Sequence, residues 1–161
     1  MTLRLEDEIR QSRPFESLGQ AAHLSISRTA ALLEHAVAEA LKPHGITLTQ
    51  FNVLRILRGA GDKGLCRREV GERMVNPVPD ATRLLDRMEA AGLIARERSA
   101  DDRRFVTTRI TEEGLRIVNL LDAPMHELHE RHFGRLEEAS LRALIDALAR
   151  VRESVQPHDP R

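Results

Sequence analysis

Apolar residues recur at helical spacing over the first quarter of the chain. They predict one long helix over residues 15–41, because these positions share one helical face: Leu18, Ala22, Ile26, Leu33, Val37 and Leu41. Residues 1–14 lack this period and are expected to form an arm. The segment 42–45, Lys-Pro-His-Gly, then ends the helix, because proline cannot continue the hydrogen-bond ladder and glycine accepts a left-handed turn.

The middle of the chain predicts three shorter helices. The first has Thr49 as its N-cap and buries three apolar residues, Phe51, Leu54 and Leu57. The second spans about residues 67–75. Pro79 is placed to open the third, over residues 80–91, because its fixed φ suits the first turn. The packing face of this third helix consists of Ala81, Leu84, Leu85 and Met88.

A two-stranded hairpin is predicted directly after these helices. Residues 93–98 and 105–110 have the composition of strands, and the polar segment 99–104 joins them as a turn. Val106, Thr108 and Ile110 share one face of the second strand, since side chains alternate along a strand.

The remaining residues predict two further helices. Thr111 caps a helix over residues 112–132, in which Pro124 predicts a kink. Gly134 ends this helix. A last helix, over residues 136–151, has five apolar positions inward: Leu141, Leu144, Ala147, Leu148 and Val151.

This order predicts a mainly α protein with a small β-wing. Helices followed at once by a hairpin form a winged helix-turn-helix, here over residues 47–111, within a single domain of residues 1–161. The flanking helices, residues 15–41 and 112–155, carry more apolar surface than this small centre can cover. A second copy of the chain is their natural partner, so we expect a homodimer.

Composition narrows the function classes. Aromatic residues make up 2% of the chain, all of them four phenylalanines, which argues against modules that stack single-stranded bases. The one cysteine, Cys66, excludes an internal disulfide framework and fits a reducing compartment. No signal peptide and no apolar run of about 18 residues is visible, so a cytoplasmic location without a membrane span is expected.

The charge is unevenly distributed although the net charge is +0. Residues 52–109 hold 13 Lys and Arg against 9 Asp and Glu, and the remainder holds 12 against 16. A basic centre between acidic ends is compatible with a DNA-facing core.

Four motifs follow one another in the second half of the chain: the helix end Leu-Leu-Asp-Arg-Met-Glu at 84–89, the Gly-Leu-Ile at 92–94, the Asp-Arg-Arg at 102–104 and the Thr-x-x-Gly at 111–114. In their order and spacing, and in the length and position of the flanking helices, the chain resembles the MarR family of bacterial transcription regulators. The resemblance implies a sequence-specific regulator of duplex DNA, more often a repressor than an activator. No phosphate-binding loop, nucleophile elbow or catalytic triad is visible in the sequence, so we expect no enzyme activity, and we expect no cofactor and no membrane partner.

The helix over residues 80–91 is the candidate for reading bases. Its width fits the major groove, and its exposed residues include Asp80, Thr82, Arg83 and Arg87. Arg83 can reach guanine O6 and N7, and Thr82 a thymine methyl or a phosphate. In the resembled family the helix opening, here Pro79 to Arg83, meets the bases. Alternatively, Arg83 and Arg87 are solvated and pair with Asp80, Asp86 or Glu89.

The hairpin turn is the second candidate contact. Arg103 and Arg104 lie at its tip, where long cations can enter a narrow minor groove. By resemblance, Arg104 is inserted and Asp102 fixes its side chain. Arg98, across the hairpin, either anchors Asp102 or touches a phosphate. The alternative is a charged, solvated surface turn.

Two departures from the family pattern concern helix starts. Pro79-Asp80 replaces the usual Ser or Thr at the start of the reading helix, so Asp80 is expected to cap the helix rather than read bases. Cys66 stands where Ser or Thr is common, with Glu69 three residues on, as in a weakened capping box. Cys66 is interpreted as an inert, half-buried thiol, with a redox role as the alternative.

Other signals are weaker. The glycines at 59, 61 and 64 follow a helix rather than a strand, so they form a loop and no dinucleotide site. His126, His129 and His132 share a helix face only partly, so they are interpreted as solvated or interfacial and a metal-sensing role as the alternative.

The expected partners follow from these features. Two copies would read an inverted repeat with half-sites about one helical turn apart. The resemblance implies a small effector, phenolic or otherwise an aromatic acid, bound between the dimer helices and the winged part, with His23 and Arg28 as candidate lining residues. A competing function is a sequence-tolerant architectural or protein-interaction module, or a metal- or oxidant-sensing regulator of the same fold.

Overall fold

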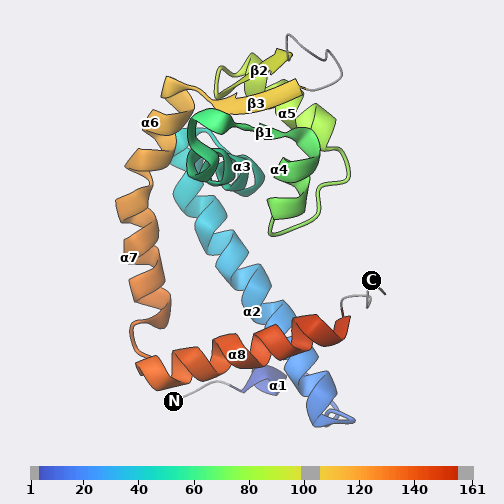
Figure 1. Cartoon of the computed structure of the whole chain (residues 1–161). Coiled ribbons are helices and arrows are strands. Elements are labelled where there is room, and N and C mark those ends of the chain that lie inside the picture. The colour runs from blue at the N-terminus through green and yellow to red at the C-terminus, as the bar shows by residue number, and fades with distance from the viewer. Residues whose placement is uncertain (1–3, 99–105, 156–161) are drawn as a thin grey trace. The chain divides into compact units, whose positions relative to one another are not determined.

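The computed structural model of the chain describes residues 4–98 and 106–155. It contains two compact units, Met1–Leu121 and Asp122–Arg161. The first unit holds α1 to α6 and a three-stranded sheet, and the second holds α7 and α8 (Figure 1).

The longest helix of the first unit is α2, Leu18–Leu41. The Ser17 hydroxyl caps it by accepting a hydrogen bond from the Gln20 backbone N–H at 3.1 Å. A one-turn helix, α1 (Leu5–Glu8), precedes it in the segment that was expected to be irregular. The helix ends as predicted: the 3-10 turn η1 (Lys42–His44) follows, and Gly45 adopts a left-handed φ of 67°.

Helix α3, Leu48–Ala60, starts two residues earlier than predicted. Its N-cap is Thr47 and not Thr49, because Thr47 forms a reciprocal capping box with Gln50. The Thr47 hydroxyl accepts from the Gln50 N–H at 3.2 Å, and the Thr47 N–H donates to Gln50 Oε1 at 2.9 Å. The predicted core residues Phe51, Leu54 and Leu57 are buried, and Val53 is buried with them.

Helices α4 (Arg67–Arg73) and α5 (Ala81–Ala90) form the helix pair of the predicted motif. Asp80 is the N-cap of α5, so Pro79 lies before the helix and does not open it, contrary to the prediction. Leu84, Leu85 and Met88 are buried as predicted, and they fix α5 to the core of the unit through one face.

The sheet has three antiparallel strands in the order β1-β3-β2, whereas two were predicted. Strands β2 (Ile94–Arg98) and β3 (Val106–Ile110) form the hairpin, with Arg96 opposite Thr108. The additional strand β1 (Leu65–Cys66) pairs with β3. It approaches β3 so closely that a Cβ on Gly64 would lie 2.6 Å from the Thr108 carbonyl oxygen, and Gly64 also has a φ of 62°.

Helix α6, Glu112–Leu120, closes the first unit. Thr111 caps it as predicted, because its hydroxyl accepts from the Gly114 N–H at 3.1 Å. A Cβ on Gly114 would lie 2.2 Å from the Leu93 carbonyl oxygen, so this helix packs directly on the backbone before β2. The winged elements thereby share one core with α3, and Leu54, Leu57 and Val118 are fully buried in it.

The second unit consists of α7 (Asp122–Phe133) and α8 (Glu138–Val155). The predicted helix over 112–132 is divided at Leu121 and is not merely kinked at Pro124. Proline has no N–H to donate to the carbonyl four residues earlier, and its ring clashes with that carbonyl. For Pro124 this is the carbonyl of Leu120, where α6 ends. Helix α7 ends at Phe133, directly before the predicted stop at Gly134. Helix α8 starts two residues later than predicted, at Glu138, and extends beyond the predicted residue 151 to Val155.

None of the helices in residues 4–98 and 106–155 is long and apolar enough to cross a bilayer.

Candidate nucleic-acid interface

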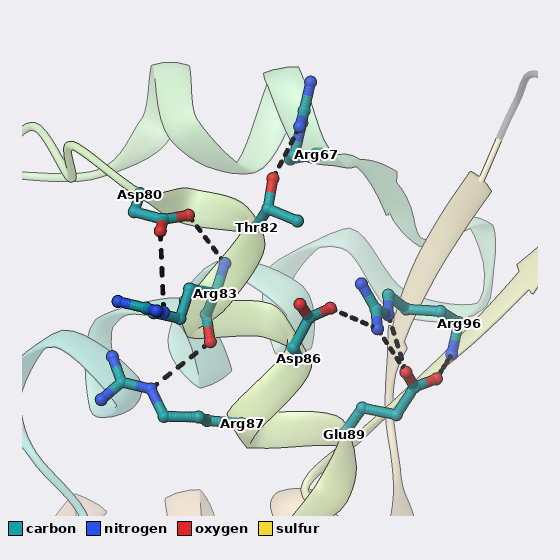
Figure 2. Close-up of polar contacts among 8 residues, drawn as sticks. All are labelled: Arg67, Asp80, Thr82, Arg83, Asp86, Arg87, Glu89 and Arg96. Atoms are coloured by element: carbon teal, nitrogen blue, oxygen red, sulfur yellow. Dashed lines mark hydrogen bonds and ion pairs between the residues drawn. The ribbon is translucent and has the colours of Figure 1, made fainter.

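Helix α5 presents its exposed residues in two rows, and the first row contains two of the arginines singled out from the sequence. Asp80 begins it: its Oδ1 accepts from the Arg83 backbone N–H at 2.9 Å, while its Oδ2 lies 4.0 Å from the Arg83 Nε (Figure 2). Arg87 follows one turn later and donates from Nε to the Arg83 carbonyl at 3.4 Å. The Arg83 side chain keeps 78% of its surface exposed, so this guanidinium is free to reach outward.

Asp80 therefore acts as the predicted helix cap. A carboxylate at this position also suits the positive end of the helix dipole. Its contact with Arg83 realises, in part, the alternative interpretation in which Arg83 pairs with a neighbouring acid. At 4.0 Å between largely exposed groups this ion pair is weak, and a stronger acceptor would displace it.

The second row of α5 consists of Thr82, Asp86 and Glu89, and two arginines from outside the helix bind it (Figure 2). Arg67, the first residue of α4, donates from Nη1 to the Thr82 hydroxyl at 2.6 Å. Arg96 of β2 contacts both acids. Neither Arg67 nor Arg96 was identified from the sequence, because both contacts join residues of different elements.

Arg96 makes the most extensive of these contacts. Its guanidinium donates to Glu89 Oε2 from Nε at 2.9 Å and from Nη2 at 2.5 Å, and its backbone N–H donates to Glu89 Oε1 at 3.1 Å. The same Nη2 lies 2.7 Å from Asp86 Oδ1. These hydrogen bonds from Arg96 lower the pKa of the Glu89 carboxyl below its ordinary value. Helix α5 is thus tied to the wing by charged groups as well as by its core.

The wing itself is described only in part. Arg98 is exposed at the end of β2, where its Cα pairs with that of Val106. The candidate residues Asp102, Arg103 and Arg104 lie outside the described residues. On the face of the sheet opposite Thr108, Arg109 donates to the Asp62 carbonyl at 2.7 Å and pairs with Glu97.

A cavity of about 440 Å³ lies beside the second row of α5. Leu85, Val106 and Thr108 supply apolar wall, and three arginines surround it, Arg67, Arg68 and Arg96. Cys66, which is half-buried, borders it at the start of α4. The Glu69 half of the predicted capping box is present, since Glu69 Oε2 accepts from the Cys66 N–H at 2.8 Å, and this hydrogen bond lowers the Glu69 pKa.

The other candidate residues are not gathered into a site. His126 and His129 are exposed on α7, and residues 4–98 and 106–155 contain no group of three or more His, Cys, Asp or Glu placed to hold a metal ion. On α2, His23 is exposed, and the Arg28 Nε lies 3.6 Å from Glu8 Oε2 of α1. The cavity described above is lined by other residues than these two.

Comparison with known proteins identifies the relatives of this arrangement. Residues 44–104 match the model of the MarR family. The transcriptional regulator TtmR of Methylorubrum extorquens is 29% identical over 140 residues, which cover 87% of this chain and 70% of TtmR. Among solved structures, CouR from Rhodococcus jostii bound to p-coumaroyl-CoA is 26% identical, with a TM-score of 0.69 over 85% of this chain and 95% of CouR.

A second solved structure is more similar in sequence. The MarR transcription factor from Planctomyces limnophilus is 32% identical, with a TM-score of 0.65, over 84% of this chain and 98% of that protein. The match therefore includes the helix pair, the sheet and the flanking helices rather than the winged part alone. The chain belongs to the MarR family of DNA-binding transcription regulators.

Proposed function

We propose that the chain is a homodimeric, sequence-specific repressor that reads an inverted repeat in duplex DNA and is released by a small-molecule effector. In this proposal residues 47–111 bind DNA, and residues 15–41 and 112–155 hold the dimer together. The observation that carries it is α5: one face is anchored in the core, and the exposed Arg83 projects from its first turn next to its cap. A guanidinium so placed suits the O6 and N7 atoms of guanine.

The unpaired apolar surface of the flanking helices supports the dimer. On α2 only Leu41 is buried, and Leu18, Ile26 and Leu32 are exposed. On α8 no residue is buried, and Leu144, Ile145 and Val151 are exposed. Apolar rows of this length on two long helices are suited to an isologous interface with a second copy.

The base contacts are tested by selection from a random-duplex library at about 150 mM salt, where weak phosphate-only binding is largely screened. A palindromic motif among the retained duplexes is expected. Arg83→Ala is then expected to lose about 1–3 kcal/mol of specific binding and to relax the preference at one base pair of each half-site. Retention without a motif would favour a sequence-tolerant architectural binder, and an unchanged motif with Arg83→Ala would remove Arg83 from the readout.

The wing contacts are tested with the same duplex. Pro79, Thr82, Arg87 and Arg98 complete the proposed contact surface on the described residues, and Asp102, Arg103 and Arg104 on the hairpin turn. If Arg104 enters the minor groove, Arg104→Ala lowers the slope of log affinity against log salt by about one per site. An unaltered slope would exclude this contact.

For the effector we propose a phenolic or other aromatic acid. The cavity of about 440 Å³ has the chemistry for one, with apolar wall for a ring and the largely exposed Arg68 for a carboxylate. The CouR structure, with its bound p-coumaroyl-CoA, shows that one relative takes an aromatic acyl ligand. His23 and Arg28 remain candidates for a second location on α2. Release requires that the acid bind the DNA-free form more tightly.

The effector is tested by titrating phenolic acids into the preformed complex with the selected duplex. We expect dissociation, and restored transcription from a promoter that carries this duplex. Acids that bind the free protein while leaving the complex intact would argue against a releasing effector.

A further inference from the structure

Two carboxylates stand on the helix that we propose to enter the major groove. Asp86 lies about one turn after Arg83, and Glu89 about one turn after Asp86, so both stand in the row beside that of Arg83. Their side chains are 54% and 37% exposed. Unpaired acids at this position would face the phosphates and repel the duplex. A helix with this sequence therefore needs a cation on the same row to bind DNA well.

Arg96 supplies that cation from a different element. Its guanidinium contacts Glu89 through two nitrogens and Asp86 through one of them, and its backbone N–H takes the remaining Glu89 oxygen (Figure 2). Only 25% of the Arg96 side chain is exposed, so it faces α5 and not the solvent. A lysine could neutralise one acid as a point charge, but it has no planar fork to bridge both.

We propose that Arg96 is a positioning residue that acts on DNA binding through two acids: it neutralises Asp86 and Glu89 on the reading helix. The helix then meets the phosphates without the repulsion of two unpaired carboxylates. This inference rests on the proposed DNA binding of α5. It assigns Arg96 no contact with a base or a phosphate.

The fold does not depend on this link. Leu84, Leu85 and Met88 already fix α5 to the core, and all three are buried. A partly exposed ion pair adds little to stability, since water and salt screen it. The loss of Arg96 is therefore expected to change DNA affinity much more than stability. The opposite result is expected for a residue that only supports the fold.

The test compares Arg96→Gln with a matched control, Arg116→Gln. Arg116 forms a similar fork with Glu113, at 2.7 and 2.6 Å, but on α6 and away from the reading helix. Because α6 belongs to the proposed dimerisation residues, sedimentation first verifies that Arg116→Gln has the oligomeric state of the wild type. Affinity for the duplex selected by the wild-type protein is measured across a salt series, and thermal unfolding is recorded for each variant. Arg96→Gln is expected to bind about 10- to 100-fold more weakly, and Arg116→Gln about as well as the wild type.

Removing the acids as well separates neutralisation from direct contact. In the triple variant Arg96→Gln, Asp86→Asn, Glu89→Gln no carboxylate remains on the row. Its affinity for the duplex is therefore expected to return to within about threefold of wild type, and the slope of log affinity against log salt is expected to return to the wild-type value. The affinity of Arg96→Lys is expected to lie between that of Arg96→Gln and that of the triple variant. If the triple variant stays as weak as Arg96→Gln, Arg96 touches DNA itself or acts only on the fold, and the inference is wrong.

Equal affinities of Arg96→Gln and Arg116→Gln would also overturn the inference. The wild-type selection separates its failure from that of the proposed function. If the wild-type protein retains no duplex, DNA binding by α5 fails first, and the role of Arg96 fails with it. If Arg96→Gln unfolds at the assay temperature while the triple variant does not, the affinity of the triple variant is compared with that of wild type. An affinity within about threefold supports the inference, and a weaker one overturns it.

Discussion

The arginines on and beside α5 have different neighbours, and this divides their roles. Arg96 and Arg67 are bound by residues of the helix, namely Glu89 with Asp86 and the Thr82 hydroxyl. A guanidinium occupied in this way is not available for a guanine. Arg83 contacts its acid only at 4.0 Å and is largely exposed, so base reading falls to the row of Arg83 and Arg87. The Thr82 hydroxyl is engaged as well, which leaves its methyl group for a thymine.

Asp80 combines a structural role with an electrostatic cost. Asp80→Ala removes the acceptor of the Arg83 N–H, so the free energy of unfolding is expected to fall by about 1 kcal/mol in urea denaturation. Asp80→Ser keeps a capping oxygen and removes the charge. It is expected to unfold like the wild type and to bind duplex more tightly at low salt, where repulsion from phosphates is least screened. Equal stability of Asp80→Ala and Asp80→Ser would show that the cap contributes nothing.

At the level of elements, the pattern could predict what depends on local sequence. The helical period, the stop at residues 42–45, the Thr111 cap and the alternation of the hairpin all appear where expected. The pattern could not predict β1, because two residues show no period and the strand exists only by pairing with β3. The Arg96 link was missed for the same reason, since α5 and β2 meet only in the folded chain.

The α5–β2 link also predicts a pH dependence. Arg96 lowers the pKa of Glu89 in the folded chain, so on acidification the unfolded chain takes up a proton first. The stability that ionised Glu89 contributes is therefore present above about pH 4.3, the ordinary glutamate value, and is lost as the pH falls through the folded pKa. The melting temperature of Glu89→Gln is expected to lie below that of wild type at pH 7 and to approach it near pH 3.

The matched variant for this comparison is Glu113→Gln. Arg116 also lowers the pKa of Glu113, so the melting temperature of Glu113→Gln should change with pH as that of Glu89→Gln does. Glu113 lies on α6, and its loss is expected to leave DNA affinity unchanged. A difference between Glu89→Gln and wild type that stays constant from pH 7 to pH 3 would contradict the role given to the ionised carboxylate.

At the scale of the whole molecule, apolar surface left open on the outer helices suggests what the single chain lacks. The sequence placed Leu144 and Val151 of α8 inward, yet their exposed fractions in the single chain are 43% and 48%. A period of apolar residues can show that a face is to be covered, but not by which surface. A second copy would cover these residues and would set the spacing of two reading helices.

Leu144→Glu is therefore expected to break the dimer. A carboxylate placed twice in an isologous interface meets its own copy across the two-fold axis or an apolar neighbour, and either costs several kcal/mol. Sedimentation at micromolar concentration should give a monomer for Leu144→Glu and a dimer for the wild type. Arg150→Glu introduces the same residue on another face of α8 and should remain a dimer.

The DNA affinity of the two variants provides a second readout. A monomer binds one half-site without the effective concentration that the linked partner provides, so Leu144→Glu should lose about a hundredfold or more in affinity for the inverted repeat. Its affinity for an isolated half-site should match that of the wild type, because α5 and its contacts are unaltered. If Leu144→Glu sediments as a dimer and binds the repeat normally, this face of α8 is not the interface.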